Sequence, residues 1–456
     1  MVPAARLCDS LFGLMSLLTR IGLAFVLVTL WGGCSLVRPT AGPAPGLAGP
    51  ARYVLPNGVP VIIEEHRASD VVALQLWVQA GARDETANEL GLAHYLEHML
   101  FKGTPTRPSG FVEREVEGVG GRINAGTSWD YTFYHTVLPA RQAAAGIEML
   151  VDVGVNASLE AGLLEAEKQV VLEEMRLNED SPQRYLSRQL YNVVFSGHPY
   201  GRAVLGTPQI IQALTRDTLL SFYRRYYVPE SFTLVVVGPV DPAEALRAAE
   251  RSLGRLPRSG FQRLPAPTPA SVSPKKLDMP RPGALAYLAF GWLGPKLDHA
   301  DTPAVDLLVS ILGQSRSSRL PQSLRERLGL VNSVRSDYAA LEAAGAITVT
   351  AQLEPANLAG AEAEVMREVQ RVREQGVTEA ELQRAITLAE AEHAFQSETA
   401  EGRARLYGRA ETVWRLAEEL AYIDRVRTVT AEQVRLVARR YLDPERYGRI
   451  AFVPPR

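Results

Sequence analysis

A repeated order of segments, interrupted by a proline-rich stretch, is the feature that most constrains how this chain can fold. Residues 53–262 and 284–456 form two blocks on either side of residues 263–283, which we expect to be a linker. Each block opens with a strand-like apolar run, VVALQLWVQAG in the first and ALAYLAFGWLG in the second. A polar loop containing an aspartate and then an amphipathic helix follow in both blocks. This order predicts an α+β protein of two homologous domains, each a mixed or antiparallel sheet with helices packed on it.

The residues before this repeat have a different character. Residues 1–34 contain the apolar run Ile21–Trp31, which is shorter than the roughly 20 residues that span a bilayer. With a basic residue before it and small residues after it, the run predicts a signal peptide or an N-terminal anchor. The residues around Cys34 resemble a bacterial lipoprotein cleavage site, so lipidation of this cysteine stays open. Residues 35–52 are rich in Pro, Gly and Ala and predict a tether. We expect an exported protein, periplasmic or membrane-anchored.

Composition excludes several classes of function. The 456 residues carry a formal net charge of −2, so the overall charge attracts neither nucleic acid nor an anionic membrane. We therefore expect membrane contact only through the N-terminal segment. Both cysteines, Cys8 and Cys34, lie at the N-terminus, so the folded body has neither a disulfide nor a thiolate metal site.

The stretch ANELGLAHYLEHML places two histidines on one face of a predicted helix. His94 and His98 are one turn apart, and Glu97 flanks the same face. Two imidazoles at this spacing can bind one Zn²⁺, with a carboxylate beside the metal to transfer protons. The alternative is a solvated helix face with accidental histidines, because short motifs also arise by chance. Thr86 and Glu89 form a capping-box signature that predicts where the helix starts.

A catalytic zinc site needs a third protein ligand, and the helical run EAGLLEAEKQVVLEEMRLNEDSP offers carboxylates. Glu167 and Glu174 are seven residues apart in this run and therefore lie on one face of the helix. A surface helix rich in glutamate is the alternative explanation, and it suffices for Glu173 and Glu179. The run alone leaves the choice of ligand open.

Three segments together resemble the pitrilysin–insulinase family of inverted-motif zinc peptidases: HYLEHMLFKGT, GGRINAGTSWDYTFYH and EKQVVLEEMRLNEDSP. The resemblance implies one Zn²⁺ per chain, bound by His94, His98 and Glu174. It also implies that Glu97 is the catalytic base and that Glu167 supports the site from the same helix face.

The resemblance extends from the start of the first block to the C-terminus and has consequences for the whole chain. It implies that the two domains form a clamshell around a substrate chamber, with the zinc site in residues 53–262 and no metal motif in residues 284–456. The implied function is a zinc metalloendopeptidase that cleaves peptides or unfolded segments with zinc-activated water. The alternative is a non-catalytic scaffold or peptide-binding subunit of the same fold, and the complete set of motif residues argues against it.

The resemblance also assigns substrate contacts in the first block. The segment GGRINAGTSWDYTFYHTVL predicts an exposed strand after a turn. In the family this edge, including Asn124 and Ala125, receives the substrate backbone as an additional strand, which leaves side-chain specificity loose. We expect His135 and His198 to be structural.

One position in the second block departs from the family pattern. Single-chain members carry an arginine and, seven residues later, a tyrosine, and both contact the substrate. Arg325 matches the arginine, but the tyrosine position holds Asn332. Tyr338 is out of register and is expected on the next strand. Because some members are two-chain enzymes, the pattern favours a heterodimer with a homologous partner subunit that supplies the arginine–tyrosine pair; a self-sufficient homodimer is the alternative.

Overall fold

The structure, a computed structural model, describes residues 49–272 and 275–455. The predicted signal or anchor segment, Cys34 and most of the predicted tether lie outside the described residues. Within the described part of the chain, no helix combines the length and the apolar character that crossing a membrane requires. We refer to residues 49–272 as the N-terminal half and to residues 275–455 as the C-terminal half.

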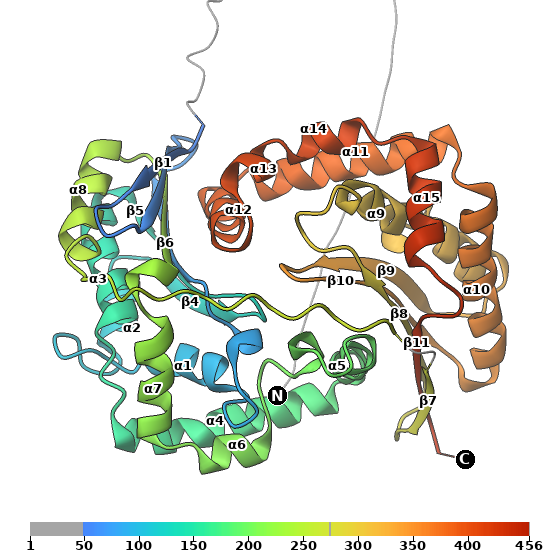
Figure 1. Cartoon of the computed structure of the whole chain (residues 1–456), viewed down its shortest axis with the longest axis horizontal. Coiled ribbons are helices and arrows are strands. Elements are labelled where there is room, and N and C mark those ends of the chain that lie inside the picture. Colours follow the sequence, from blue (N-terminus) through green and yellow to red (C-terminus); the bar gives the residue numbers. More distant parts are fainter. Residues whose placement is uncertain (1–48, 273–274, 456) are drawn as a thin grey trace, which may run out of the picture. The chain divides into compact units, whose positions relative to one another are not determined.

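The N-terminal half contains a six-stranded sheet in the order β1-β2-β6-β3-β5-β4 (Figure 1). Its strands are β1 (Ala51–Val54), β2 (Pro60–Glu65), β3 (Val71–Val78), β4 (Arg122–Thr127), β5 (Thr132–Pro139) and β6 (Phe232–Gly238). Neighbours are antiparallel except β2 and β6, which are parallel. β1 begins at Ala51, inside the stretch predicted as a tether, because its backbone pairs with β2 from Ala51 opposite Ile63 onwards.

The C-terminal half contains a five-stranded sheet in the order β7-β11-β8-β10-β9. Its strands are β7 (Lys275–Pro280), β8 (Ala286–Gly294), β9 (Ser333–Ala340), β10 (Gly345–Leu353) and β11 (Gly448–Val453). The predicted linker 263–283 is therefore only partly a linker, since β7 lies within it and pairs in parallel with β11. A proline-rich composition did not reveal this strand, because the pairing partner lies at the far end of the chain.

The two sheets repeat one pattern. The order β6-β3-β5-β4 in the first corresponds to β11-β8-β10-β9 in the second, and each has one parallel pair at its other side. The central strands β3 and β8 are the two apolar runs that open the blocks. The α+β prediction with two related sheets is confirmed.

Helices lie around both sheets (Figure 1). Those of the N-terminal half are α1 (Leu92–Leu100), α2 (Phe111–Gly118), α3 (Ala143–Val155), α4 (Ala161–Asp180), α5 (Pro182–Val194), α6 (Pro208–Ala213), α7 (Arg216–Tyr226) and α8 (Pro242–Ser252). Those of the C-terminal half are α9 (Thr302–Val309), α10 (Leu358–Gln375), α11 (Glu379–Gln396), α12 (Ala400–Val413), α13 (Leu416–Leu420), α14 (Tyr422–Arg427) and α15 (Ala431–Tyr441). Two π-helical segments, η5 (Ser310–Gln314) and η6 (Pro321–Arg327), follow α9.

Two helices pack on the sheet of the opposite half. α12 lies against β3 and β6 of the first sheet, and α5 lies against β8 and β11 of the second. The approach of α12 requires a glycine, because a Cβ on Gly408 would stand 1.9 Å from Nε1 of the fully buried Trp77. Burial of Trp77 against α12 removes a large apolar surface from water and so stabilises the association of the halves.

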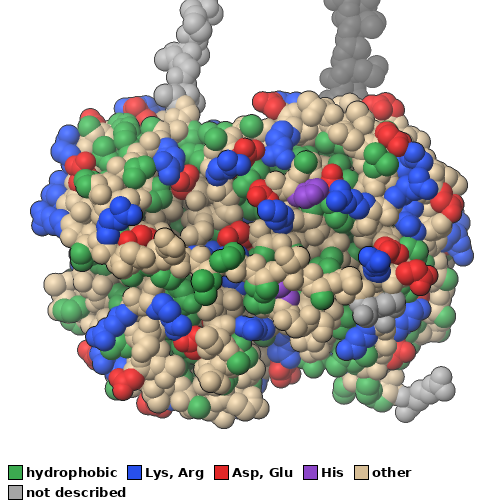
Figure 2. Space-filling view, viewed as in Figure 1, with side chains coloured by type: hydrophobic (Ala, Val, Ile, Leu, Met, Phe, Trp, Pro, Cys, Tyr) green, Lys and Arg blue, Asp and Glu red, His purple; other side chains and the backbone are tan. Residues whose placement is uncertain are grey.

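The surface is mixed in charge. On the face drawn in Figure 2, Lys and Arg side chains alternate with Asp and Glu side chains. This distribution agrees with the small formal net charge of the chain.

Candidate metal centre

The helix α1 presents the inverted motif on the side that faces α4. It begins at Leu92 after the N-cap Gly91, whose φ of +96° lies in the left-handed region that favours glycine. Thr86 and Glu89 do interact, since the Thr86 N–H donates to Glu89 Oε2 at 3.0 Å. The capping-box prediction of the helix start is nevertheless wrong, because this pair closes a turn that precedes the helix.

Three side chains from α1 and α4 converge. Glu174 Oε2 lies 3.5 Å from Nε2 of His94 and 3.5 Å from Nε2 of His98. Among the described residues, these three form the one group of histidine, cysteine and carboxylate side chains whose potential ligand atoms all lie within 4.8 Å of one another. The structure thus brings together the three residues that the sequence assigned to zinc.

The donor atoms fit a zinc ion. Ligand atoms about 2.0–2.1 Å from a tetrahedral Zn²⁺ lie about 3.3 Å from one another, close to the 3.5 Å found between each histidine and Glu174. Two imidazole nitrogens and one carboxylate oxygen are a ligand set of catalytic zinc sites, which leave a fourth position for water. Burial lowers the pKa of His94 to about 4, so this imidazole is neutral and able to bind a metal at neutral pH.

Glu167 orients one of the histidines. Its Oε1 lies 2.9 Å from Nδ1 of His98, and its Oε2 forms an ion pair with Nζ of Lys102 at 2.7 Å. Outer partners of this kind fix the tautomer and ring orientation of a ligating histidine. Burial works against the charge on His98, but hydrogen bonds to Glu167 and Glu174 outweigh it and raise the pKa of His98 to about 9. Glu167 thus acts on the site through the candidate ligand His98. Its second partner, Lys102, was not predicted from the sequence.

Glu97 is held beside the ligands by a strand. Thr127, the last residue of β4, donates its hydroxyl to Glu97 Oε2 at 2.5 Å. Burial raises the pKa of Glu97, while the Thr127 hydrogen bond opposes that shift. A carboxylate with a raised pKa is suited to take up and release a proton. Thr127 lies in the segment GTSWDYTF, but nothing local to that segment pointed to Glu97.

The predicted substrate edge is an edge in the structure. β4 is the last strand of its sheet and pairs only with β5, and it contains Asn124 and Ala125. The Ala125 N–H donates to Asn124 Oδ1 at 2.8 Å. Because β4 ends at Thr127, a chain paired with this edge would run towards Glu97.

A cavity of about 540 Å³ is lined by residues of α4 that follow the ligand Glu174, but by none of the metal ligands. Trp129 and Tyr191 stack in its wall, with ring centroids 4.9 Å apart and planes inclined by 1°. Met175, which follows the ligand Glu174, also lines the cavity, as does the exposed Arg184. The cavity therefore combines aromatic walls with a cation.

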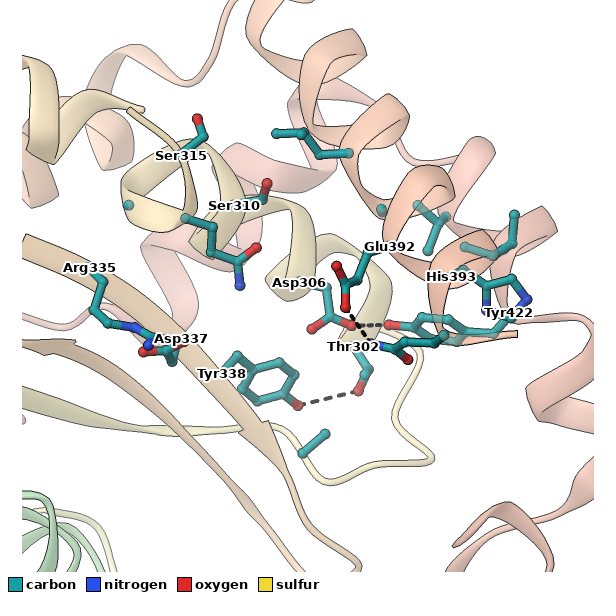
Figure 3. Close-up of a pocket in the computed structure, with 18 of the residues that line it drawn as sticks. Thr302, Asp306, Ser310, Ser315, Arg335, Asp337, Tyr338, Glu392, His393 and Tyr422 are labelled. Atoms are coloured by element: carbon teal, nitrogen blue, oxygen red, sulfur yellow. Dashed lines mark hydrogen bonds and ion pairs between the residues drawn. The ribbon is translucent and has the colours of Figure 1, made fainter. Parts of the chain in front are cut away.

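A second cavity, of about 900 Å³, is lined by residues of the C-terminal half and by none of the metal ligands (Figure 3). Asp306 on α9 accepts a hydrogen bond from the Tyr422 hydroxyl there, and Tyr338 lies 3.4 Å from Thr302 (Figure 3). Arg325 lines the same cavity and pairs with the neighbouring Glu326. Among the described residues, no ion pair or hydrogen bond joins Arg325 to the metal centre, so the structure does not bring it together with the other predicted site residues.

The structure locates Tyr338 and Asn332, the two residues that bear on the missing tyrosine. Tyr338 lies on β9, as expected, and its hydroxyl donates to the Pro295 carbonyl at 2.7 Å. Asn332 is exposed, and its backbone N–H donates to the Gln352 carbonyl at 2.8 Å. Position 332 therefore has no phenol, and the hydroxyl of Tyr338 is bonded to the Pro295 carbonyl instead of standing in for it.

His135 and His198, the two histidines expected to be structural, contact residues outside the metal centre. His135 lies 3.2 Å from Glu401 of α12, and burial lowers the pKa of His135. His198 Nδ1 accepts a hydrogen bond from the Tyr200 N–H at 3.1 Å.

Known proteins match both halves. Residues 60–208 match the family model described as insulinase (peptidase family M16), and residues 213–388 match the model described as the peptidase M16 inactive domain. A zinc protease of Mycobacterium tuberculosis that is described as uncharacterized is 32% identical over 421 residues, covering 91% of this chain and 96% of that protein. A Bacillus subtilis protein with the same description is 30% identical over 298 residues, or 65% of this chain and 72% of that protein.

Solved structures share the fold. A protease from Helicobacter pylori superposes with a TM-score of 0.84 at 23% identity, covering 90% of this chain and 100% of that chain. A structure described as a peptidase M16 inactive domain, from Pseudomonas fluorescens, gives a TM-score of 0.83 at 21% identity, covering 90% and 98%. At these identities the similarity establishes the fold alone.

Proposed function

Because this chain belongs to the insulinase (M16) family of peptidases, we propose that it is a zinc metalloendopeptidase that cleaves peptides or unfolded segments. The observation that supports this most strongly is the convergence of His94, His98 and Glu174 with a carboxylate, Glu97, beside them. The relatives named as zinc proteases support the choice of metal.

Each residue of the metal centre has a separate role in the proposed reaction. His94, His98 and Glu174 would hold Zn²⁺, which when bound would supply the polarisation that makes a water molecule nucleophilic. Glu97 takes the proton of that water and later delivers it to the leaving amine. The hydrogen bond from Thr127 restricts the rotation of Glu97, and Glu167 occupies Nδ1 of His98, which would leave Nε2 to bind the metal.

Substrate binds as an additional strand on β4. The edge of β4 offers main-chain hydrogen bonds along Asn124 and Ala125, which recognise an extended chain of almost any sequence. The cavity beside Trp129 and Tyr191 accepts a bulky side chain of that extended chain. Most of the backbone of a folded protein is already hydrogen-bonded, so peptides and unfolded segments are the substrates that fit this edge best.

The chain works with a homologous partner subunit that supplies the arginine–tyrosine pair. Position 332 holds an asparagine without a phenol, and Arg325 makes no ion pair or hydrogen bond with the metal centre in the part of the chain that the structure describes. A homodimer without that pair is the alternative. The N-terminal segment suggests that this enzyme acts outside the cytoplasm, in the periplasm or anchored to a membrane, with lipidation at Cys34 as one route.

A second candidate function is peptide binding without cleavage. The match of residues 213–388 to a model named as an inactive domain and the asparagine at position 332 favour it. The complete set of ligands and base in α1 and α4 favours the peptidase.

Cleavage of a quenched-peptide library by the zinc-loaded full chain tests the proposal. We expect Glu97→Gln to retain zinc and to lose about 10²- to 10⁴-fold in turnover, because it removes the base and leaves the ligands in place. Full activity in Glu97→Gln would contradict the role of Glu97. If the zinc-loaded wild type cleaves no peptide, a missing partner subunit is favoured. If it still cleaves no peptide after a homologue with the tyrosine is added, the non-catalytic binding subunit is favoured.

A further inference from the structure

The helix that carries both histidines has no capping side chain of its own. Its N-cap is Gly91, and no side chain at that position accepts a hydrogen bond. The first N–H groups of a helix have no partner within the helix. In α1 these groups lie directly before His94, so their partners affect how this ligand is held.

Glu85 provides the acceptor from outside the helix. Its Oε2 accepts the N–H of Gly91 and its Oε1 accepts the N–H of Ala93, both at 2.9 Å. The Glu85 side chain is buried, with the residue only 3% exposed. A carboxylate at this end of a helix also interacts favourably with the helix dipole. Because Ala93 directly precedes His94, these two bonds hold the turn from which the first imidazole projects.

The residues beside Glu85 belong to a buried ion cluster that joins the two halves. The cluster consists of Arg83, Asp84, Asp130, Arg263 and Glu342. Arg83 lies 3.3 Å from Asp130 and 3.1 Å from Glu342, and Arg263 lies 2.6 Å from Asp84 and 2.9 Å from Glu342. Both arginine side chains are less than a tenth exposed, so solvent screens these pairs little.

The cluster connects the second sheet to the zinc helix in a short series of contacts. Glu342 lies in the turn between β9 and β10 and holds both arginines. The arginines hold Asp84, and Glu85 follows it in the chain. Arg202 fixes the backbone of Glu85 as well, since its Nη1 donates to the Glu85 carbonyl at 2.7 Å. From Glu85 two hydrogen bonds reach the first turn of α1.

We propose that Glu85 is a positioning residue of the metal centre and that the ion cluster makes this positioning depend on contact between the halves. The β9–β10 turn holds residues 83–85, and these residues hold the first turn of α1 in the orientation that zinc binding needs. The inference rests on the zinc site proposed above. It assigns a role in metal binding to Glu342, a residue of the half that has no metal ligands.

Zinc affinity of the full chain tests this inference. We would measure it by competition with a chromophoric chelator, well below the melting temperature of each variant, and record the visible spectrum of the Co²⁺-substituted protein. We expect Glu85→Gln to weaken zinc binding about tenfold, the lower end of the effect of changing a direct outer partner of a metal ligand, because Glu85 acts through the backbone of Gly91 and Ala93. Glu342→Ala should weaken it several-fold. Both should alter the cobalt spectrum, which a loss of global stability alone would not do.

Glu89→Gln is the matched control, because Glu89 is an acid in the same loop whose side chain bonds Thr86 and Arg225 and not α1. We expect it to change zinc affinity less than about twofold. If Glu85→Gln does not fold, Glu85→Asp replaces it, since the shorter side chain cannot reach both amides. Wild-type affinity and spectrum in the folded Glu85 variant would overturn the positioning role, and wild-type values in Glu342→Ala would overturn the dependence on the other half. A wild-type protein that binds no zinc would instead overturn the zinc site itself.

Discussion

The N-terminal and C-terminal halves share a sheet order but differ in the helix that follows the central strand. After β3, α1 directs two histidines and a glutamate towards α4. After β8, α9 has no histidine or glutamate, and its Val305, Leu308 and Val309 are fully buried in the core of that half. The comparison teaches that the fold needs the helix only as an apolar partner for the sheet. Chemistry requires polar side chains on the face of the helix that packing leaves free.

The two halves also use their acids differently. In the N-terminal half, Glu167 and Glu174 face histidines, and a hydrogen bond with His98 lowers the pKa of Glu174. In the C-terminal half, Asp306 faces a tyrosine, and burial raises the pKa of Asp306 to about 6. The first set has histidines beside its acids and can bind a cation, whereas the environment of Asp306 disfavours its charged form.

The largest effect that separates the halves should follow from removing a metal ligand. His94→Ala or Glu174→Ala should lose zinc, from about one ion per chain to nearly none, because two remaining ligands do not form a catalytic site. The loss of affinity should exceed the roughly 10- to 100-fold effect of an outer-shell change, and peptide cleavage should vanish with it. Metal analysis after desalting measures the content, with melting curves to verify folding. Zinc retained by His94→Ala would place the metal elsewhere, including the C-terminal half.

A smaller effect should come from placing a phenol at position 332 of the C-terminal half. Asn332→Tyr should raise kcat/KM of the isolated chain about 10- to 100-fold, because a hydroxyl donor to the developing oxyanion typically has an effect of this size or larger. Quenched-peptide kinetics measure it, and Asn332→Phe is the control of similar size without the hydroxyl. Equal activity in the tyrosine and phenylalanine variants would show that the missing phenol does not limit this chain.

The smallest effect should be on stability, at Asp306. The folded carboxyl titrates near 6 and the unfolded carboxyl near 3.8, so between these values the folded state binds the proton more strongly. The free energy of unfolding of the wild type therefore falls as the pH rises through that window. Asp306→Asn escapes this penalty and can still accept the bond from Tyr422, so it should be more stable than the wild type by about 1–2 kcal/mol at pH 7 and not at pH 4. Urea unfolding at both pH values measures the difference, and zinc content should not change. A gain of equal size at both pH values would contradict the titration of Asp306.

Local periodicity was sufficient to predict the helices of the metal centre and the faces that carry the ligands. A spacing of four residues placed His94 and His98 together, and a spacing of seven placed Glu167 and Glu174 together, because a helix brings such positions to one side. The choice of Glu174 as the ligand came from family resemblance, and the structure places it opposite both imidazoles. The placement of Asn124 and Ala125 on an edge strand was predicted in the same way and is seen in the order of the sheet.

Contacts between distant segments could not be predicted in this way. The acceptor at the start of α1 is Glu85 and not the Thr86–Glu89 pair, although both lie in one short loop. Thr127 reaches Glu97 across 30 positions, and Arg263 of the supposed linker is buried between the halves.

The sequence by itself thus determined on which helical faces the candidate histidines and acids lie, and the family resemblance selected Glu174 among the acids. The tertiary structure alone decided which acid caps the zinc helix, which strand restrains the base, and how the second half contacts the first. The reason is that a helical face follows from spacing within a few residues, whereas a buried polar group takes whatever partner the complete fold brings within hydrogen-bonding distance.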